Sequence, residues 1–250
     1  MAVFQAALLN EIEKLYKKKK ALVAVLLSLA IIVIGQVIII GVRSGFGLRG
    51  VGSAEFPMLV LSVVVNTILP LFTALVAIDS FSGEFSQNTM RITLTRPVNR
   101  FKIFTAKITA IAFFILANLL LLLILSVLAG FLFNTNSATF SAIARTILSY
   151  VVSLPPLLVL GLGIVLIANF FKSGTSVFFV SILCFIILKI LGLVFFRYSG
   201  MLITTQLDWY NLWVANSFPI GKIARQFLIM LGYALMLFTV GFYLFDKKEF

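Results

Sequence analysis

The chain has 250 residues, of which 62% are apolar and only 11% are charged. A soluble domain carries about 25% charged residues, so this composition excludes an ordinary soluble fold and predicts a protein whose surface faces lipid. The net charge of +12 comes without a soluble basic domain, which argues against a nucleic-acid-binding protein and favours basic loops beside anionic headgroups.

Two residue types that carry much of enzyme chemistry are scarce. There is no histidine, which excludes histidine-ligated metal sites and histidine-dependent catalytic triads. The single cysteine, Cys184, lies in an apolar run and cannot form an intramolecular disulfide. We therefore expect no catalytic residue, no metal and no cofactor in this chain, and an intramembrane enzyme is the weakest functional hypothesis.

The first 20 residues are expected to form an interfacial helix followed by a basic flank. Apolar residues recur there at helical spacing opposite polar ones: Phe4, Leu8, Ile12 and Leu15 against Asn10, Glu13 and Lys17. The alternative is a plain cytoplasmic extension of the first span. The first apolar run is too long for the core of a signal peptide, so we expect a retained span.

Six runs with almost no charge approach the length of about 20 residues that a helix needs to cross a bilayer. They predict spans at residues 21–42, 56–78, 108–132, 146–171, 177–196 and 227–245. Pro70 and the pair Pro155-Pro156 should bend the second and fourth spans. We predict an all-α polytopic membrane protein with one domain over residues 1–250, and both chain ends on one side because the number of spans is even.

The orientation follows from the lysines and arginines that flank the spans. The side that holds both chain ends and residues 79–107 has 13 of the 20 basic residues, whereas the other side has 6. The richer side is expected to be cytoplasmic, in a bacterial plasma membrane. On the outer side, residues 197–226 carry Trp209, Tyr210 and Trp213, which fit the headgroup belt, and we expect short interfacial or re-entrant helices there.

Few polar residues interrupt the predicted spans. Lys189 either faces a substrate pathway or snorkels to the outer surface about 10 Å away, and we favour snorkelling. The uncharged amides are expected to hydrogen-bond between helices rather than to bind cargo; they belong to Gln36, Asn66, Asn118 and Asn169. The candidates for a substrate pathway are Gln36, Asn66, Asn118 and Lys189.

The segment between the second and third spans has a specific organisation. Residues 79–107 read DSFSGEFSQNTMRITLTRPVNRFKIFTAK, in which Phe81 and Phe85 can form one edge of a short helix. This segment resembles the hallmark of type-2 ABC (ATP-binding cassette) transporter permeases. The matching positions are Glu84, Thr89, Arg91, Arg96, Pro97, Val98, Arg100 and Lys107. One departure is Gln87-Asn88, where many relatives carry a glycine.

The resemblance implies a coupling helix that docks in a groove on a separate ATPase subunit and passes nucleotide-driven motion to the membrane. The residues assigned to this coupling are Phe81, Glu84, Phe85, Thr89, Arg91, Arg96, Pro97 and Arg100. The implied partners are an ATPase dimer that holds ATP and magnesium, a second permease, identical or homologous, and membrane lipid. The alternative is a positive-inside loop whose arginines only face lipid phosphates.

The chain lacks a phosphate-binding loop of the G-x-x-x-x-G-K-[ST] type, because Asn216 stands where the first glycine would precede Gly221-Lys222. The energy source is therefore expected on a partner chain. The resemblance predicts the permease subunit of an ABC transporter that exports a peptide or an amphiphilic antibiotic-like substrate. The alternative is a channel or secondary transporter for an ion or small solute, although no Asp or Glu lies within a predicted span to couple ion movement.

Overall fold

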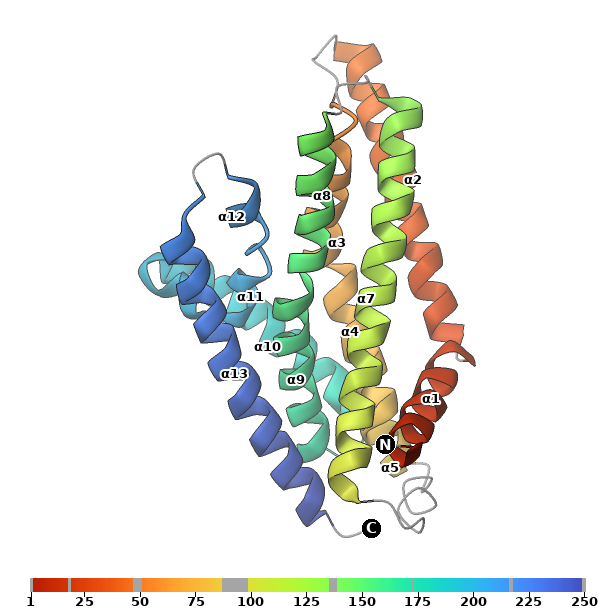
Figure 1. Cartoon of the computed structure of the whole chain (residues 1–250), viewed down its shortest axis with the longest axis vertical. Coiled ribbons are helices and arrows are strands. Elements are labelled where there is room, and N and C mark those ends of the chain that lie inside the picture. Colours follow the sequence, from red (N-terminus) through yellow and green to blue (C-terminus); the bar gives the residue numbers. More distant parts are fainter. Residues whose placement is uncertain are drawn as a thin grey trace.

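The computed structural model describes residues 2–17, 19–46, 51–86, 99–134, 139–171, 173–215 and 218–248. Within these ranges all regular elements are helices, which confirms the prediction of an all-α fold. Six helical segments are long and apolar enough to cross a membrane, as predicted. Most of them run along one long axis (Figure 1).

The first helical pair consists of α1 (Ala2–Lys17) and α2 (Lys19–Phe46). Figure 1 shows α1 inclined to α2 and crossing the lower part of α7, so α1 is a separate helix and not a straight extension of the span. Leu15 of α1 is buried in the core, whereas α2 leaves Leu26, Val33 and Ile38 exposed. Exposed aliphatic side chains on an apolar helix of 28 residues are suited to contact lipid.

The second apolar run forms two helices, α3 (Glu55–Asn66) and α4 (Ile68–Ser80), and a short helix, α5 (Ser82–Ser86), follows. The break falls at Thr67, one turn before Pro70. Proline has no N–H to bond the carbonyl four residues earlier and its ring collides with that carbonyl, so a helix is interrupted there. The predicted bend at Pro70 is therefore present.

The third and fourth spans differ in continuity. The third is the uninterrupted α7 (Arg100–Phe133), with 34 residues, whereas the fourth is divided into α8 (Phe140–Val152) and α9 (Leu154–Phe170). The division lies at Ser153, directly before the prolines that open α9. Tyr150 of α8 is 1% exposed, and its hydroxyl donates to the carbonyl of Pro57 at 2.9 Å.

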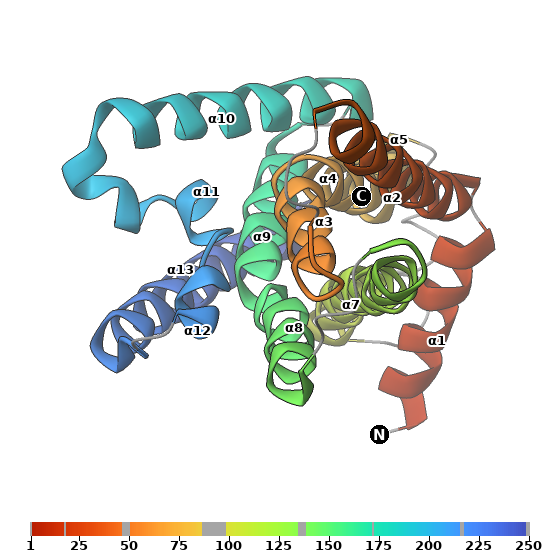
Figure 2. The same cartoon turned by 90° about the horizontal axis from the view of Figure 1, so that it is seen from above.

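The C-terminal part begins with a steeply inclined helix and ends with a long helix that packs on α9. It comprises α10 (Gly174–Val194), η1 (Phe196–Met201), α11 (Ile203–Gln206), α12 (Asn211–Val214) and α13 (Ile220–Lys247). Figure 2 shows α10 in profile while α3, α4 and α7 are seen nearly end-on, so α10 is steeply inclined to them. In Figure 2, α11 lies between α10 and α13, whereas α12 lies beside α13 toward α8.

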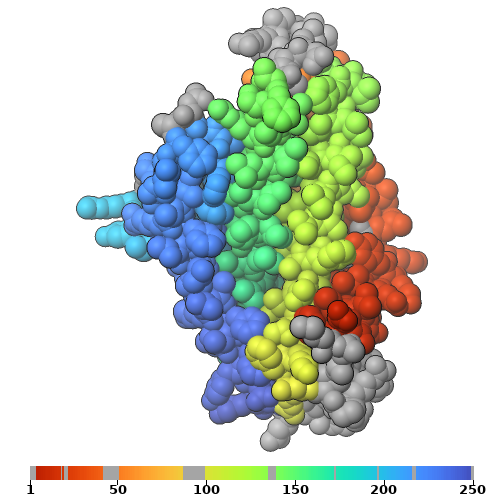
Figure 3. Space-filling view, viewed as in Figure 1, coloured from red at the N-terminus to blue at the C-terminus, as the bar shows by residue number. Residues whose placement is uncertain are grey.

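The two ends of the bundle differ in charge and in the segments that they carry. One end, called here the basic end, holds α1, α5, the start of α7 and the end of α13 (Figure 1). The opposite end, called the far end, holds α3, α8 and α12. On the face shown in Figure 3, α13, α9, α8 and α7 lie side by side. Both chain ends therefore lie near the same end of the bundle, as an even number of spans requires.

A close helix approach at the far end gives a test of this packing. A Cβ atom at Gly130 of α7 would lie 2.5 Å from the backbone carbonyl oxygen of Ser53. Gly130→Ala should therefore lower the midpoint of thermal unfolding in detergent, with a cost of about 1–3 kcal/mol. The matched control is Gly232→Ala in α13, where a Cβ meets no atom within 4 Å. This control should keep or raise the midpoint, and equal midpoints for the two variants would contradict the packing described.

Candidate functional site

Four charged side chains form a closed cluster at the basic end. This charge quartet consists of Glu11 and Lys14 from α1, Glu84 from α5 and Lys107 from α7. Lys107 lies 3.1 Å from Glu11 and 2.8 Å from Glu84, and Lys14 lies 2.9 Å from Glu11 and 3.1 Å from Glu84. Each carboxylate therefore uses one oxygen for each lysine, and the quartet has no net charge.

Three of the four side chains are shielded from solvent, whereas the side chain of Lys14 is 37% exposed. Lys107 is fully buried, and Glu11 and Glu84 are 5% and 8% exposed. Ions are removed from water only at a large cost, which their mutual attraction offsets when the geometry is good and the charges balance. The quartet meets both conditions, and it therefore joins α1, α5 and α7 into one unit.

The ionisation of the two α1 residues fits this geometry. Burial raises the pKa of Glu11, but the attraction and hydrogen bonds of Lys107 and Lys14 outweigh it, and the pKa is lowered overall. Burial lowers the pKa of Lys14, but Glu11 and Glu84 outweigh it and the pKa is raised overall. Glu11 therefore stabilises the fold above its ordinary pKa of 4.5 and loses this effect as the pH falls through the lowered value.

An aromatic cluster lies beside the quartet, with the Phe81 ring 5.9 Å from the Lys107 ammonium, and extends to α13. The ring of Phe81 is fully buried and packs edge-on against Phe104 of α7 at 5.7 Å and Phe245 of α13 at 6.0 Å between centroids. Phe104 also contacts Phe238 at 5.3 Å. Such edge-to-face contacts add about 0.5–1.5 kcal/mol each beyond the area that they bury. The cluster therefore attaches α13 to the same unit as the quartet.

Two further contacts close this unit around the end of α13. The guanidinium of Arg100 donates to the backbone carbonyls of Asp246 and Lys248. The ammonium of Lys248 lies 3.8 Å from the centroid of the Phe85 ring, a cation–π contact. The quartet, the aromatic cluster and these contacts are together called the basic-end hub.

The coupling residues named from the sequence fall into two groups. The structure brings Phe81, Glu84, Phe85 and Arg100 together in the hub. The others, Thr89, Arg91, Arg96 and Pro97, lie outside the described residues, so their assignment to coupling stays a prediction. We expected Glu84 to face a partner subunit, but its carboxylate points into the chain because Lys14 and Lys107 bind it there.

Sequence reasoning missed the importance of Glu11. The apolar stripe of α1 is completed by Leu8, Ile12 and Leu15, which pack on or within the core. Glu11 lies between them on the same face, three positions after Leu8 and four before Leu15. A carboxylate inside an apolar helix face requires a cationic partner, and this was the available signal.

Of the four proposed pathway residues, Asn66 and Lys189 bond each other, whereas Gln36 and Asn118 bond elsewhere. Gln36 donates its amide to the carbonyl of Ala129 on α7 at 3.2 Å, and Asn118 donates to Phe114 within its own helix at 2.8 Å. Asn169, also expected to bond between helices, donates to Gly241 of α13 at 3.3 Å. Asn118 therefore departs from the expectation, since its bond lies within one helix.

Lys189 is half-buried and bonds within the chain, and the interpretation that it snorkels stays a prediction. Its ammonium donates to the side-chain oxygen of Asn66 at 2.5 Å, and the Asn66 amide donates to the carboxylate of Asp208 at 2.9 Å. Asp208 is brought to this position by the turn that connects α11 and α12. Lys189, Asn66 and Asp208 therefore form a polar chain across α10, α3 and the segment before α12.

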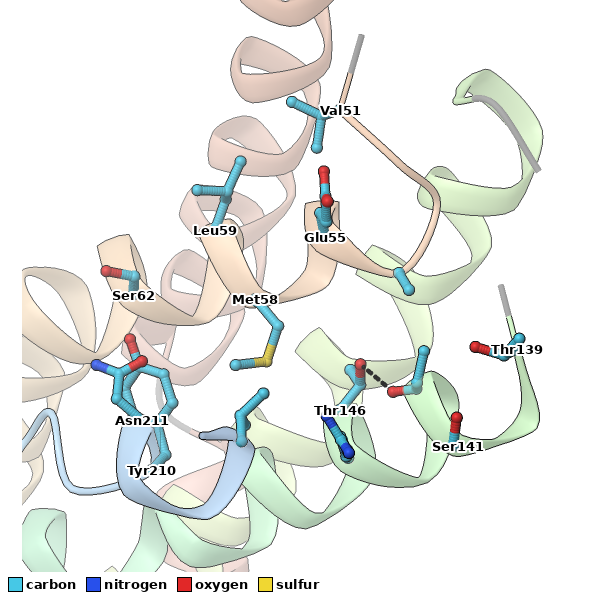
Figure 4. Close-up of a pocket in the computed structure, with 14 residues that line it drawn as sticks. Val51, Glu55, Met58, Leu59, Ser62, Thr139, Ser141, Thr146, Tyr210 and Asn211 are labelled. Carbon is cyan, nitrogen blue, oxygen red and sulfur yellow. Dashed lines mark hydrogen bonds between the residues drawn. The ribbon is translucent and has the colours of Figure 1, made fainter. Parts of the chain in front are cut away.

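A pocket of about 700 Å³ lies at the far end between α3, α8 and α12. Figure 4 shows Met58 and Leu59 of α3, Thr146 of α8 and Tyr210 around it. Its lining also includes the exposed Arg145. Burial raises the pKa of Tyr210, so its hydroxyl remains protonated near neutral pH. A mixed lining of this kind can bind a molecule that has both apolar and polar parts.

Within the described residues, no group of three or more His, Cys, Asp or Glu side chains is placed to hold a metal ion. The polar side chains of the hub pair with one another and with the backbone. The hub is therefore suited to transmit movement between helices, and the far-end pocket is suited to bind a ligand.

Comparison with known families identifies the class of protein to which these features belong. A family model described as ABC-2 family transporter protein matches residues 7–176, which is more than half of the chain. The chain belongs to the ABC-2 transporter family. Among curated proteins, none matches it significantly.

Membership of the ABC-2 family makes this chain a membrane transport protein of an ABC system. The matched range contains the whole charge quartet, from Glu11 to Lys107. Lys189, Asp208 and α13 lie beyond it. The hub is therefore built partly from the matched region and partly from the C-terminal helix of this ABC-2 chain.

Charge balance in the quartet can be tested directly. Lys107→Met should destabilise the chain by about 3 kcal/mol or more, because it leaves two buried carboxylates with one lysine. Lys107→Met combined with Glu84→Gln should recover much of this loss, because Glu11 and Lys14 remain as a neutral pair. Lys17→Met is the control, since Lys17 forms an exposed pair with Glu13 at 3.3 Å that contributes less than about 1 kcal/mol.

The measurement is the midpoint of thermal unfolding of the purified variants in the same detergent. The midpoint should be highest for Lys17→Met, lower for the double variant and lowest for Lys107→Met. A double variant as unstable as Lys107→Met would show that charge balance is not what stabilises the quartet.

Proposed function

We propose that this chain is the permease subunit of an ABC exporter for a peptide or another amphiphilic substrate, powered by a separate ATPase dimer that holds ATP and magnesium. The observation that carries the proposal is the basic-end hub in a chain of the ABC-2 family. The segment that resembles a coupling helix, α5, is bound there to α1, α7 and α13. A second permease, identical or homologous, would complete the transporter.

The hub supports a role in which α5 passes movement to several helices at once. Glu84 connects α5 to α1 and α7, and Phe81 connects α4 and α5 to α13. Ser86 is exposed at the end of α5, where a partner has access. A displacement of α5 would therefore shift α1, α7 and α13 together, while the ATPase contacts the exposed side.

The orientation and the substrate class belong to the same proposal. The excess of basic residues supports a cytoplasmic position for the basic end, so the far-end pocket would open on the outer side of what we propose is a bacterial plasma membrane. The lining of this pocket combines Met58 and Leu59 with the exposed Arg145. This combination favours an amphiphilic substrate over an inorganic ion.

The ATPase contact can be tested with two arginine substitutions at exposed serines. Ser86→Arg places a bulky cation at the end of α5 and should reduce co-purification of the ATPase by tenfold or more, about 1.4 kcal/mol of binding. Ser141→Arg at the far end is the matched control and should not change it. The measurement is the ATPase-to-permease ratio after affinity purification from cells that express both. Equal ratios would place the contact elsewhere than α5.

The orientation can be tested by labelling of single cysteines in a Cys184→Ala background. Ser141→Cys should react with a membrane-impermeant maleimide in intact cells, whereas Ser86→Cys should react only after the membrane is opened. The physical reason is that the two serines lie at opposite ends of spans that the basic flanks orient. Labelling of Ser86→Cys from outside would reverse the proposed topology.

A further inference from the structure

The far-end pocket is lined by a polar face of an otherwise apolar helix. Ser141, Arg145 and Thr146 of α8 all line it, whereas Ile147 and Val151 are exposed outside the lining. The helix α8 lies in a segment that is apolar and long enough to span a membrane. Polar side chains in such segments are costly against lipid, so they face a water-filled cavity or the protein interior. The polar face of α8 therefore serves the pocket.

Two exposed side chains of opposite charge line this pocket. Glu55 is the only charged residue of α3, and Arg145 is the only charged residue of α8. The ion pairs among the described residues include neither of them. One carboxylate oxygen of Glu55 accepts a hydrogen bond from the N–H of Gly52 at 3.1 Å, which leaves the other oxygen for a ligand. Because both side chains are exposed, an occupant of the pocket can contact both charges directly.

The two charges lie at different depths. Both helices begin at the far end of the bundle (Figure 1). Glu55 is the first residue of α3, whereas Arg145 lies about 8 Å along α8 from Phe140. An extended chain covers about 3.3–3.6 Å per residue, so the terminal charges of a tripeptide are about 10 Å apart. A ligand whose ammonium and carboxylate are separated by a few residues therefore matches this arrangement better than a single amino acid, whose charges are adjacent.

The rest of the lining combines apolar and polar groups. Met58 and Leu59 of α3 supply apolar contacts, and the Asn211 side chain of α12 is exposed. Figure 4 shows Glu55 and Met58 on α3 and Ser141 on α8 around the same space. The volume of about 700 Å³ is within the range of small-ligand sites. Polar groups interrupt the apolar surface on each helix, which suits the alternating amides and side chains of a peptide better than the continuous hydrocarbon of a lipid.

We propose that the far-end pocket recognises a short apolar peptide by both of its charged ends. The peptide carboxylate binds the guanidinium of Arg145, the peptide ammonium binds the carboxylate of Glu55, and apolar side chains pack on Met58 and Leu59. This specifies the substrate class of the proposed function and rests on that function. Binding to the pocket itself requires no ATPase, so it can be measured on this chain alone.

A single thiol in the lining reports occupancy. Ser141→Cys is prepared in a Cys184→Ala background, and the full chain is purified in dodecyl maltoside, which carries no charge. The alkylation rate by an uncharged maleimide is measured as trileucine with free ends is added. The rate should fall several-fold and reach a plateau. Each rate is divided by the rate of the same variant without peptide, because a neighbouring charge also changes thiol reactivity.

Three matched peptides separate the two charges. N-acetyl-trileucine lacks the ammonium, trileucine amide lacks the carboxylate, and N-acetyl-trileucine amide lacks both. The concentration that gives half protection should rise by about three- to tenfold for each charge removed. The doubly blocked peptide is the most apolar of the four, so partition into the micelle predicts the reverse order.

Two charge-removing variants assign each end of the peptide, and a third is the control. In Arg145→Gln, trileucine and trileucine amide should protect equally, while the preference for a free ammonium is kept. Glu55→Gln should show the opposite pattern, and its amide oxygen can still accept from the N–H of Gly52. Arg197→Gln is the matched control, since Arg197 is exposed in η1 and does not line the pocket. It should keep both preferences.

Three outcomes would overturn the proposal: equal protection by all four peptides, an unchanged carboxylate preference in Arg145→Gln, and stronger protection by lysophosphatidylethanolamine than by trileucine. The last outcome would instead assign the pocket to a zwitterionic lipid. Co-purification of the ATPase is measured in parallel. A chain that binds the ATPase but gives one of these outcomes contradicts this inference alone, whereas a chain that binds peptide but no ATPase contradicts the proposed function.

Discussion

The basic end of the structure depends on the charge quartet. Its four side chains come from three helices, and no single helix could bury its own members without the others. If α5 moved away alone, Glu11 would face two lysines and a net positive charge would remain, and if α1 moved away, Glu84 and Lys107 would each lose one of their two ion pairs. Both losses are costly for buried charges. Apolar side chains of similar size could give equal or greater stability. What the quartet adds is a fixed register, because each carboxylate must reach both lysines.

This fixed register matters because α7 is one continuous helix, whereas the spans beside it are interrupted. The continuous helix α7 runs for 34 residues from the hub to the far end, where Gly130 contacts the backbone at Ser53. The neighbouring spans are interrupted at Thr67 and Ser153. The far-end pocket lies between α3 and α8, which are the segments beyond those interruptions. Under the proposed function, a movement that enters at α5 would be carried by the continuous α7 and would change the shape of the pocket at the two interruptions.

The sequence predicts the spans well because a bilayer imposes a length and a polarity on each of them. It also predicts the interruptions at Pro70 and Pro155, since proline acts on its own helix. It does not predict the partners of the charged side chains. Lys107 and Glu11 are 96 positions apart, and Lys189 and Asn66 are 123 apart. Their pairing depends on how the helices pack and on where the turn before α12 places Asp208. Local sequence patterns do not encode this packing.

The inward orientation of Glu84 changes how the coupling segment is understood. Glu84 and Lys107 stand near the two ends of the segment that resembles the permease hallmark, and their side chains are 2.8 Å apart. They therefore clamp both ends of this segment to one buried point, and Glu11 and Lys14 fasten that point to α1. A load applied between the clamped ends cannot be absorbed by sliding of α5 along α7, because sliding would break the ion pairs. The acidic residue of the segment thus holds the helices together, and under the proposed function a partner would contact the surface that α5 exposes.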